Sequence, residues 1–368
     1  MKPSSCSQAI AASLLLIGLA AIGGAAEPVT LGNVVDPGPN DPDEPLAAKF
    51  SIDRATHFLD SAALTWQKDQ QCLTCHTNFA YLYARPAASS DAIAHREVRQ
   101  FAEKLVSERW QQEGPRWDAE IVAAAAALAF NDAASTGKLH LQTRTALDRM
   151  WTVQQKDGGW NWLKCDWPPM ESDDHYGATL AAIAVGVAPE RYAETPAAQQ
   201  GLMGIRRYLR DNPPPTLHHR AMLLWASSYL PDIQTDVEQA ATVADLLSLQ
   251  KPDGGWCLAT LGDWKRTDEL AQDTESSDGY GTGFVVFVLR RSGMSPLDEP
   301  LKRGITWLKT HQRESGRWFT RSLNQDGMHY ITHAGTAMAV MAIDACEAQP
   351  ATSPTSATAE PPSRSEPP

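Results

Sequence analysis

Nearly continuous apolar runs alternate with more polar segments along residues 50–346, and one order of segments recurs. In three stretches a helix-like segment ends in Gln, a glycine-rich turn with Trp follows, and an apolar segment comes after a loop. The turns read QQKDGGWNW from Gln154, LQKPDGGWC from Leu249 and HQRESGRWF from His311. The apolar segments read SDDHYGATLAAIAVG from Ser172, SSDGYGTGFVVFVLRR from Ser276 and YITHAGTAMAVMAI from Tyr330. A shared order indicates an internal repeat rather than unrelated amphipathic helices.

Weaker copies of the same order start at Ala63, Ser107 and Arg206. Together with the clear copies they predict six pairs of helices. The first helices are expected to end near Trp66, Trp110, Trp151, Leu209, Leu249 and Trp307, and the second helices to begin near Cys75, Asp118, Asp174, His218, Asp278 and Thr332.

The two helices of a pair differ in polarity. The second helices are apolar on all sides, as at 121–130 and 284–289, whereas the first helices carry charge. A helix that is apolar all round is buried on every side. The sequence therefore predicts an all-α fold, an (α/α)6 toroid of six helix hairpins with the apolar helices inside. The glycine-rich turns then lie at one end, beside the N-termini of the inner helices, where free N–H groups favour anionic and polar ligands.

The order Gln-x-x-x-Gly-Gly-Trp, followed by an Asp-rich start of an inner helix, resembles the repeats of the squalene-hopene cyclase and protein prenyltransferase β-subunit superfamily. The resemblance covers most of residues 50–346. It implies the α/α toroid and, for the cyclase branch, an acid that protonates an alkene. It does not decide whether this chain is an enzyme, since one fold hosts many functions.

Carboxylates cluster where two inner helices are expected to start. One cluster is Glu171-Ser172-Asp173-Asp174, and the other contains Asp278. The first is similar to the Asp-x-Asp-Asp motif of squalene-hopene cyclases, with Glu171 in place of the first Asp. Crowded carboxylates in a dry cavity raise one another's pKa, so one stays protonated as a general acid. Asp173, Asp174 and Asp278 are therefore candidate catalytic residues. The alternative is that they cap helices, since Ser and Asp are preferred at N-caps.

The sequence Cys72-Leu-Thr-Cys75-His76 is similar to a c-type haem attachment site, with both thiols bound to the haem and His76 bound to its iron. Haem c is the cofactor this motif predicts, and a redox partner protein would follow. The candidates for a sixth iron ligand are His175, Met328, His329 and His333. A Cys72–Cys75 disulfide and a shared metal site remain as alternatives.

The metal alternative is zinc, which takes Cys and His ligands in tetrahedral sets. His76 and His333 are its candidate ligands, and Cys165 and Cys257 lie in the same kind of loop as the Cys72 motif. Prenyltransferase β-subunits hold one zinc at the mouth of such a ring. The Asp-x-Cys arrangement of that family is missing from this sequence.

Several aromatic residues fall in the loops at the same end. Trp160, Trp256 and Trp318 repeat with the turns and are expected to wedge between repeats. The candidates for contact with a small apolar or carbohydrate ligand are Trp162, Trp167, Trp264, Tyr176 and Tyr280. We expect the pair His218-His219 to cap a helix or to lie on the surface.

The termini and the charge complete the picture. Residues 1–26 are expected to form a signal peptide, 27–49 a flexible acidic linker, 50–346 one toroid domain, and 347–368 a disordered tail. These features predict a periplasmic or secreted protein with no stable membrane span once the signal is removed. The net charge of −12 without a basic stripe argues against nucleic-acid binding. Three hypotheses follow: a haem-carrying redox or ligand-binding protein, an enzyme acting on an apolar or carbohydrate ligand, and a non-catalytic binding module.

Overall fold

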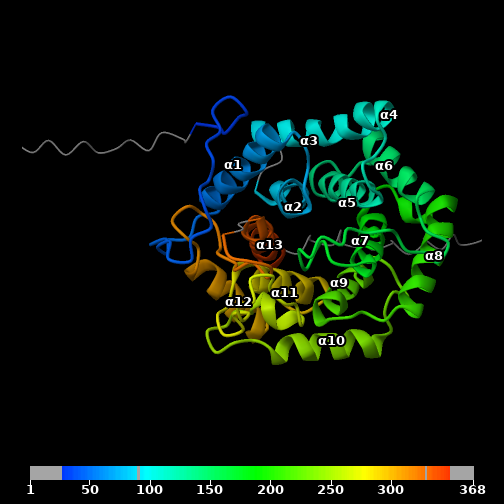
Figure 1. Ribbon diagram of the computed structural model, residues 1–368. Helices are drawn as coiled ribbons and strands as arrows, with labels where there is room; N and C mark the ends of the chain where they lie inside the picture. The colour runs from blue at the N-terminus through cyan, green and yellow to red at the C-terminus, as the bar shows by residue number, and fades with distance from the viewer. Residues whose placement is uncertain (1–26, 89–91, 328–329, 349–368) are drawn as a thin grey trace, which may run out of the picture.

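The computed structural model describes residues 27–88, 92–327 and 330–348. These residues form helices and loops, with no named β-strand among them, so the all-α prediction is confirmed. The helices make two concentric rings (Figure 1). The inner ring consists of the π-helical turn Cys75–Phe79 with α2 (Ala80–Ala84), α5 (Asp118–Ser135), α7 (Asp174–Val187), α9 (Leu217–Ser227), α11 (Gly279–Arg291) and α13 (Tyr330–Glu347). The outer ring consists of α1 (Ile52–Gln70), α3 (Ile93–Lys104) with its extension through Leu105–Arg109 and α4 (Trp110–Gln112), α6 (Leu141–Thr152), α8 (Pro196–Asp211), α10 (Asp236–Ser248) and α12 (Glu299–Thr310).

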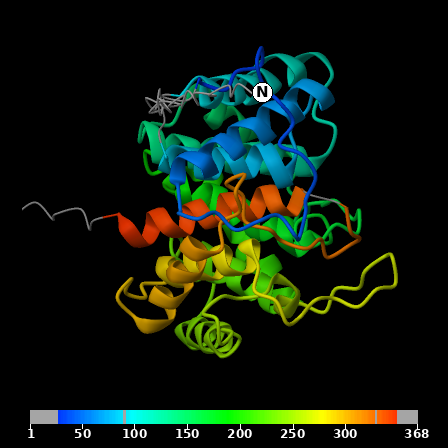
Figure 2. The same ribbon diagram turned by 90° about the vertical axis from the view of Figure 1, so that its left-hand side faces the viewer.

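The ring closes where the last inner helix meets the first. Helix α13 packs against α11 on one side and against α2 on the other, and the remaining inner helices contact their neighbours in chain order. The inner helices are buried on all sides, as the apolar runs predict: every residue of 121–130 is buried. Seen from the side, α13 runs through the middle of the molecule, with the helices of the first repeat on one side and α11 and α12 on the other (Figure 2). The six hairpins thus form the predicted (α/α)6 toroid.

The recurring Gln and Trp fasten each turn to its neighbours. The amide of Gln154 donates to the carbonyl of Gly158 in its own turn at 2.9 Å and to Gly201 in α8 at 3.0 Å. The indole of Trp160 donates to the carbonyl of Met150 at the end of α6 at 3.2 Å. Gln250 and Gln312, and Trp256 and Trp318, make the corresponding bonds in their own turns. The three Trp side chains are buried and bond within their own hairpins, so the expected wedging between repeats stays a prediction.

Residues 27–49 lie against the toroid rather than standing away from it as a linker. The Arg317 guanidinium donates to the carbonyls of Pro37 at 2.6 Å and Pro39 at 2.7 Å, and it pairs with the Glu44 carboxylate at 3.1 Å. The segment therefore covers the turn of the last repeat. The expected signal peptide and most of the expected tail lie outside the described residues. In the part of the chain that the structure describes, no helix has the length and apolar character needed to cross a membrane.

Candidate active site at the N-terminal ends of the inner helices

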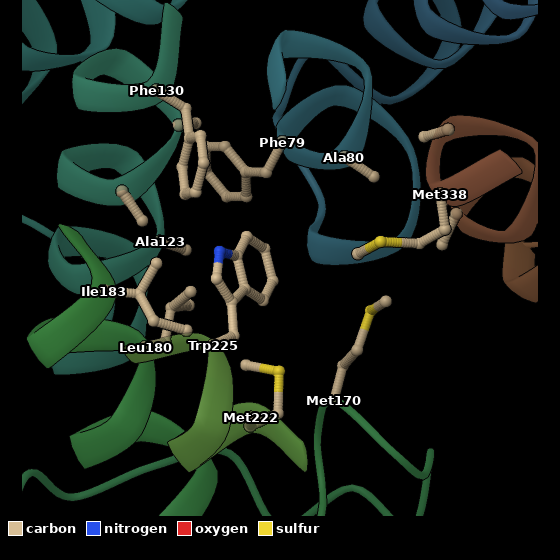
Figure 3. Close-up of a cluster of buried hydrophobic side chains, with 14 of the residues drawn as sticks. Phe79, Ala80, Ala123, Phe130, Met170, Leu180, Ile183, Met222, Trp225 and Met338 are labelled. Carbon is tan, nitrogen blue, oxygen red and sulfur yellow. The ribbon is translucent and has the colours of Figure 1, made fainter. Parts of the chain in front are cut away.

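The loop between α6 and α7 crosses the N-terminal end of the ring and reaches into it. The indole of Trp162 donates to the carbonyl of Met170 at 2.7 Å, and its ring packs against Tyr176 of α7 with 5.7 Å between centroids. This anchor turns the side chain of Met170 into the ring, toward Met222 and Trp225 (Figure 3). The next residue, Glu171, is thereby fixed at the end of the ring.

The interior below this loop is apolar. Its side chains come from the π-helical turn and from α2, α5, α7, α9 and α13, and they surround a common centre (Figure 3). The labelled members are Phe79, Ala80, Ala123, Phe130, Met170, Leu180, Ile183, Met222, Trp225 and Met338, all buried. Three of them are methionines and three are large aromatic residues, so the interior offers both adaptable thioethers and π-faces.

Glu171 and His76 meet at the end of this interior. The Glu171 Oε1 atom lies 3.6 Å from His76 Nδ1, and the two side chains are 14% and 8% exposed. Burial raises the pKa of Glu171 to about 7. Burial lowers the pKa of His76 to about 4. A proton shared by this pair therefore resides on the carboxyl group, and both groups are uncharged in mildly acidic solution.

Asp173 has the opposite electrostatic character. It caps α7 by accepting from the Tyr176 N–H at 2.9 Å, and it also accepts from Ser172 Oγ at 3.0 Å and pairs with His219 Nε2 at 3.0 Å. Burial alone would raise its pKa, but the hydrogen bond and charge of His219, with the other donors, lower it to about 2. Asp173 is accordingly an ionised capping residue over the ordinary pH range.

The other two candidate acids also accept backbone N–H groups. Asp174 accepts from the Trp162 N–H and from Lys164 Nζ, each at 2.9 Å, so it fastens the loop to α7. Asp278 caps α11 and accepts from the N–H groups of Gly281 at 2.8 Å and Leu258 at 2.6 Å, while burial raises its pKa to about 6. The capping interpretation describes Asp173 and Asp278; their catalytic role, and that of Asp174, stays a prediction.

The histidines of α9 belong to the same end of the ring. The expectation that they lie on the surface is wrong. His218 and His219 are 0% and 1% exposed. His218 Nε2 lies 3.1 Å from the Tyr280 hydroxyl, and its ring stacks on Phe284 at 4.6 Å. Burial holds the pKa of His218 well below its ordinary value, so the imidazole is neutral. Their burial could have been predicted from their position at the start of a segment expected to be an inner helix.

Two of the expected aromatic ligand contacts are structural. Trp162 holds the Met170 carbonyl, and Tyr176 packs against Trp162. Trp264 lies with its ring 5.9 Å from that of His218, and Tyr280 bonds to the same histidine. The rings of Tyr176, Trp264 and Tyr280 all pack around His218. Trp167 is half-buried in the loop that carries Glu171.

The three residues of the expected haem motif have different surroundings. Cys72 lines a groove of about 280 Å³ together with Phe101 and Leu105, outside the ring. Cys75 faces the inner end: burial, then the nearby Glu171 charge, raises the pKa of its thiol. His76 is buried beside Glu171. Haem attachment at these three residues stays a prediction.

The disulfide and metal alternatives have no counterpart in the described residues. Cys72, Cys75, Cys165, Cys257 and Cys346 are free thiols. No three of the His, Cys, Asp and Glu side chains in the described ranges come together as a metal site. His333 Nδ1 lies 2.9 Å from Thr77 Oγ1 and so ties α13 to the π-helical turn. His175 packs edge-on against His219 at 5.2 Å, whereas Met328 and His329 lie outside the described residues.

The raised pKa of Glu171 predicts a pH-dependent stability difference between the native protein and Glu171→Gln. Between pH 4.5 and 7 the unfolded chain releases the Glu171 proton while the folded chain keeps it, so this group's contribution to stability falls as pH rises. Gln removes that cost. We expect equal free energies of unfolding near pH 4 and a variant about 3 kcal/mol more stable at pH 8. Urea unfolding at both pH values measures this, and a difference independent of pH would contradict it.

Comparisons with known proteins concern the fold. No protein-family model and no curated protein matches the sequence. Among solved structures the chain is similar to ent-copalyl diphosphate synthase from Streptomyces platensis, with 16% identity, a TM-score of 0.48, and coverage of 76% of this chain and 54% of that one. The chain thus spans about half the length of that synthase. It is also similar to the type II terpene cyclase MstE from Scytonema, with 13% identity, a TM-score of 0.46, and coverage of 80% and 98%.

Proposed function

We propose that this protein is an enzyme that donates a proton from Glu171 to a carbon–carbon double bond of an apolar, isoprenoid-like ligand held inside the ring. The observation that carries the proposal is the position of Glu171, buried against His76 at the end of an apolar interior. The neighbouring carboxylates of Asp173, Asp174 and Asp278 are each occupied by backbone N–H groups. Such donors favour the ionised form of a carboxyl group, and Glu171 is the acid of this cluster that they do not stabilise in that form.

The chemistry requires only a proton. The Glu171 carboxyl transfers it to one alkene carbon, and the π electrons form the new C–H bond, which leaves a carbocation on the neighbouring carbon. A second double bond of the same ligand then supplies an electron pair for a C–C bond, and loss of a proton from the product cation to the Glu171 carboxylate restores the acid. The reaction is an isomerisation without oxidant or reductant. Because His76 has the lower pKa, it does not take the proton from Glu171, and the carboxyl group stays protonated and neutral.

The interior supports a cationic intermediate. Phe79, Phe130 and Trp225 present aromatic rings within the cluster, and aromatic faces attract cations. Met170, Met222 and Met338 have flexible thioether side chains that repack around apolar ligands of different shape. The aromatic side chains and the methionines offer no hydroxyl, amine or carboxylate group that would trap the carbocation.

The test is a product search with purified protein. Squalene, geranylgeraniol and farnesol are incubated at pH 5.5, and extracts are examined by gas chromatography and mass spectrometry. We expect a product of unchanged mass from at least one of them, or one heavier by a water molecule if solvent captures the cation. Unchanged substrates with a folded protein, across this panel and its diphosphate esters, would refute the proposal.

The haem motif is a separate prediction, made from spacing alone, and no step of the proposed chemistry uses haem. It is tested by expressing the full precursor in a host that matures c-type cytochromes, which also tests export by fractionation. The prediction is a band on a denaturing gel that stains for haem peroxidase activity and is lost in Cys72→Ala/Cys75→Ala. A colourless band at full expression would remove it.

A further inference from the structure

A large cavity opens at the opposite end of the ring from Glu171. Its volume is about 810 Å³, within the range of roughly 300–1,000 Å³ typical of ligand pockets. It lies among the last turns of the inner helices α5, α7, α11 and α13, together with the end of α2 and the residues that follow α9. The large apolar and aromatic side chains of its wall are Tyr83, Phe130, Tyr229, Phe287 and Met341.

A chain of packed aromatic rings runs along the wall of this cavity. Phe130 packs against Tyr83 with 4.9 Å between ring centroids and against Trp225 at 5.3 Å. Trp225 in turn packs edge-on against Phe287 at 5.1 Å. Neither Glu171 nor His76 is among the residues that line this cavity. The cavity is therefore a second site, which shares the ring of Phe130 with the apolar interior but does not include the acid cluster.

Two arginines stand at the mouth of this cavity. Arg290 is fixed by donating to the carbonyls of Ala345 at 3.0 Å and Met294 at 3.4 Å. The exposed Arg291 lies over the Tyr229 ring at 4.5 Å from its centroid. In the described part of the chain no carboxylate lies within salt-bridge distance of either arginine. The rim also carries one acid, Asp344, so the arginines outnumber it two to one.

The C-terminal ends of the inner helices disfavour a bound anion at this mouth, and the positive charges of Arg290 and Arg291 compensate for that effect. The inner helices direct the negative ends of their dipoles toward this mouth. Arg290 already compensates part of that charge, since it donates to a carbonyl in the last turn of α13. Burial also raises the pKa of Asp344, which favours its neutral form. Arg291 is left available for an incoming group.

We propose that this cavity binds a long-chain amphiphile, with its hydrocarbon tail against the aromatic wall and its phosphate or carboxylate head group at Arg290 and Arg291. Guanidinium groups bind such head groups through paired, charge-assisted hydrogen bonds. The apolar wall supplies the driving force for the tail. Neither the acid cluster nor its chemistry takes part.

The chain itself offers one competing occupant. Ala348 lies at the rim, and residues 349–368 follow it in the sequence. That segment reads QPATSPTSATAEPPSRSEPP and contains no aromatic residue and no Leu, Ile, Val or Met. It lacks the side chains needed to fill an aromatic-walled cavity, so the amphiphile is the better occupant. A chain ending at Ala348 tests the point directly.

Binding is measured by calorimetry with a matched pair of ligands, dodecyl phosphate and dodecanol. We expect both to bind, with the phosphate bound about tenfold more tightly because of the charge-assisted bonds. Arg290→Gln/Arg291→Gln is expected to remove that preference and to leave dodecanol binding unchanged. Truncation after Ala348 is expected to leave both affinities unchanged; tighter binding on truncation would make the tail the native occupant and overturn the proposal.

A cavity-filling variant separates this site from the rest of the molecule. Ala134 lines the cavity and is exposed, so Ala134→Trp fills the space without entering the core. We expect it to abolish binding of both ligands with an unchanged circular dichroism spectrum, whereas Glu171→Gln binds as the native protein does. Binding that survives Ala134→Trp, or no binding of either ligand to the native protein, would overturn the proposal. Flotation with phosphatidylcholine vesicles, with and without phosphatidic acid, then distinguishes a membrane lipid from a free amphiphile as the source of the head group.

Discussion

Replacing Glu171 by Gln is expected to lower turnover of an isoprenoid substrate by about 10²–10⁴-fold, the usual contribution of a general acid. Gln keeps the size and the polar character of the side chain but has no proton to donate to an alkene. The loss is expected in the rate constant, measured by gas chromatography under saturating substrate, and the far-ultraviolet circular dichroism spectrum is expected to be unchanged. Since the pKa of Glu171 is raised to about 7, native activity is expected to fall as pH rises above that value.

The matched control is Asp174→Asn. Asparagine keeps an oxygen that accepts from the Trp162 N–H and loses only the ion pair with Lys164, a half-exposed contact worth at most about 1 kcal/mol. Activity within about fivefold of the native value is therefore expected. The reverse pattern, an active Glu171→Gln and an inactive Asp173→Asn of unchanged stability, would assign the proton to Asp173 instead. That result would return the acid to the position that the resemblance to squalene-hopene cyclases implies.

The fold was accessible from the sequence because each repeat carries its own local signals. Predicted starts of inner helices at Cys75, Asp118 and Asp174 coincide with the observed first residues of the π-helical turn, α5 and α7. Capping residues and the change from charged to wholly apolar segments locate such boundaries. Ring closure followed from counting six pairs whose second helices have no polar face.

The choice among the acids could not be predicted from spacing. Four residues, Glu171 to Asp174, hold three carboxylates, and their protonation depends on which of them receive N–H donors from distant parts of the chain. Asp173 is ionised because His219, on a different repeat, bonds to it. Glu171 keeps its proton because it is buried, and part of that burial comes from His76, nearly a hundred residues earlier in the chain, which lies 3.6 Å from it and remains neutral itself. Such long-range pairs leave no pattern in the local sequence.

The environment of His218 and His219 illustrates the same limit in a weaker form. Their burial follows from the apolar character of the segment around them, so it could have been predicted. Their partners could not, since Tyr280 and Phe284 come from the next inner helix and Trp264 from a long loop. The haem motif is the converse case: its spacing is a local signal, and haem attachment stays a prediction made from that signal.

The first glycine of the repeated turn is expected to be among the most sensitive positions for folding. Gly158 and Gly254 have φ values of +102° and +96°, in the left-handed region. A Cβ atom at Gly158 would collide with the backbone carbonyl of Gly204 in α8, and one at Gly254 would lie 2.9 Å from the carbonyl of Arg303 in α12. Gly158→Ala therefore combines backbone strain with overpacking and is expected to lower the free energy of unfolding by about 3 kcal/mol.

Gly293→Ala is the control for this prediction. Its φ of +102° equals that of Gly158, but a Cβ atom there would meet nothing within 4 Å. Backbone strain alone then costs about 1 kcal/mol. Urea unfolding at one pH measures both variants, and the difference of about 2 kcal/mol isolates the close approach between turn and outer helix. Equal losses would mean that conformation alone requires glycine in the turn. Unequal losses would explain the repeated glycine by the packing of each turn against the next outer helix, the contact through which neighbouring repeats build the ring.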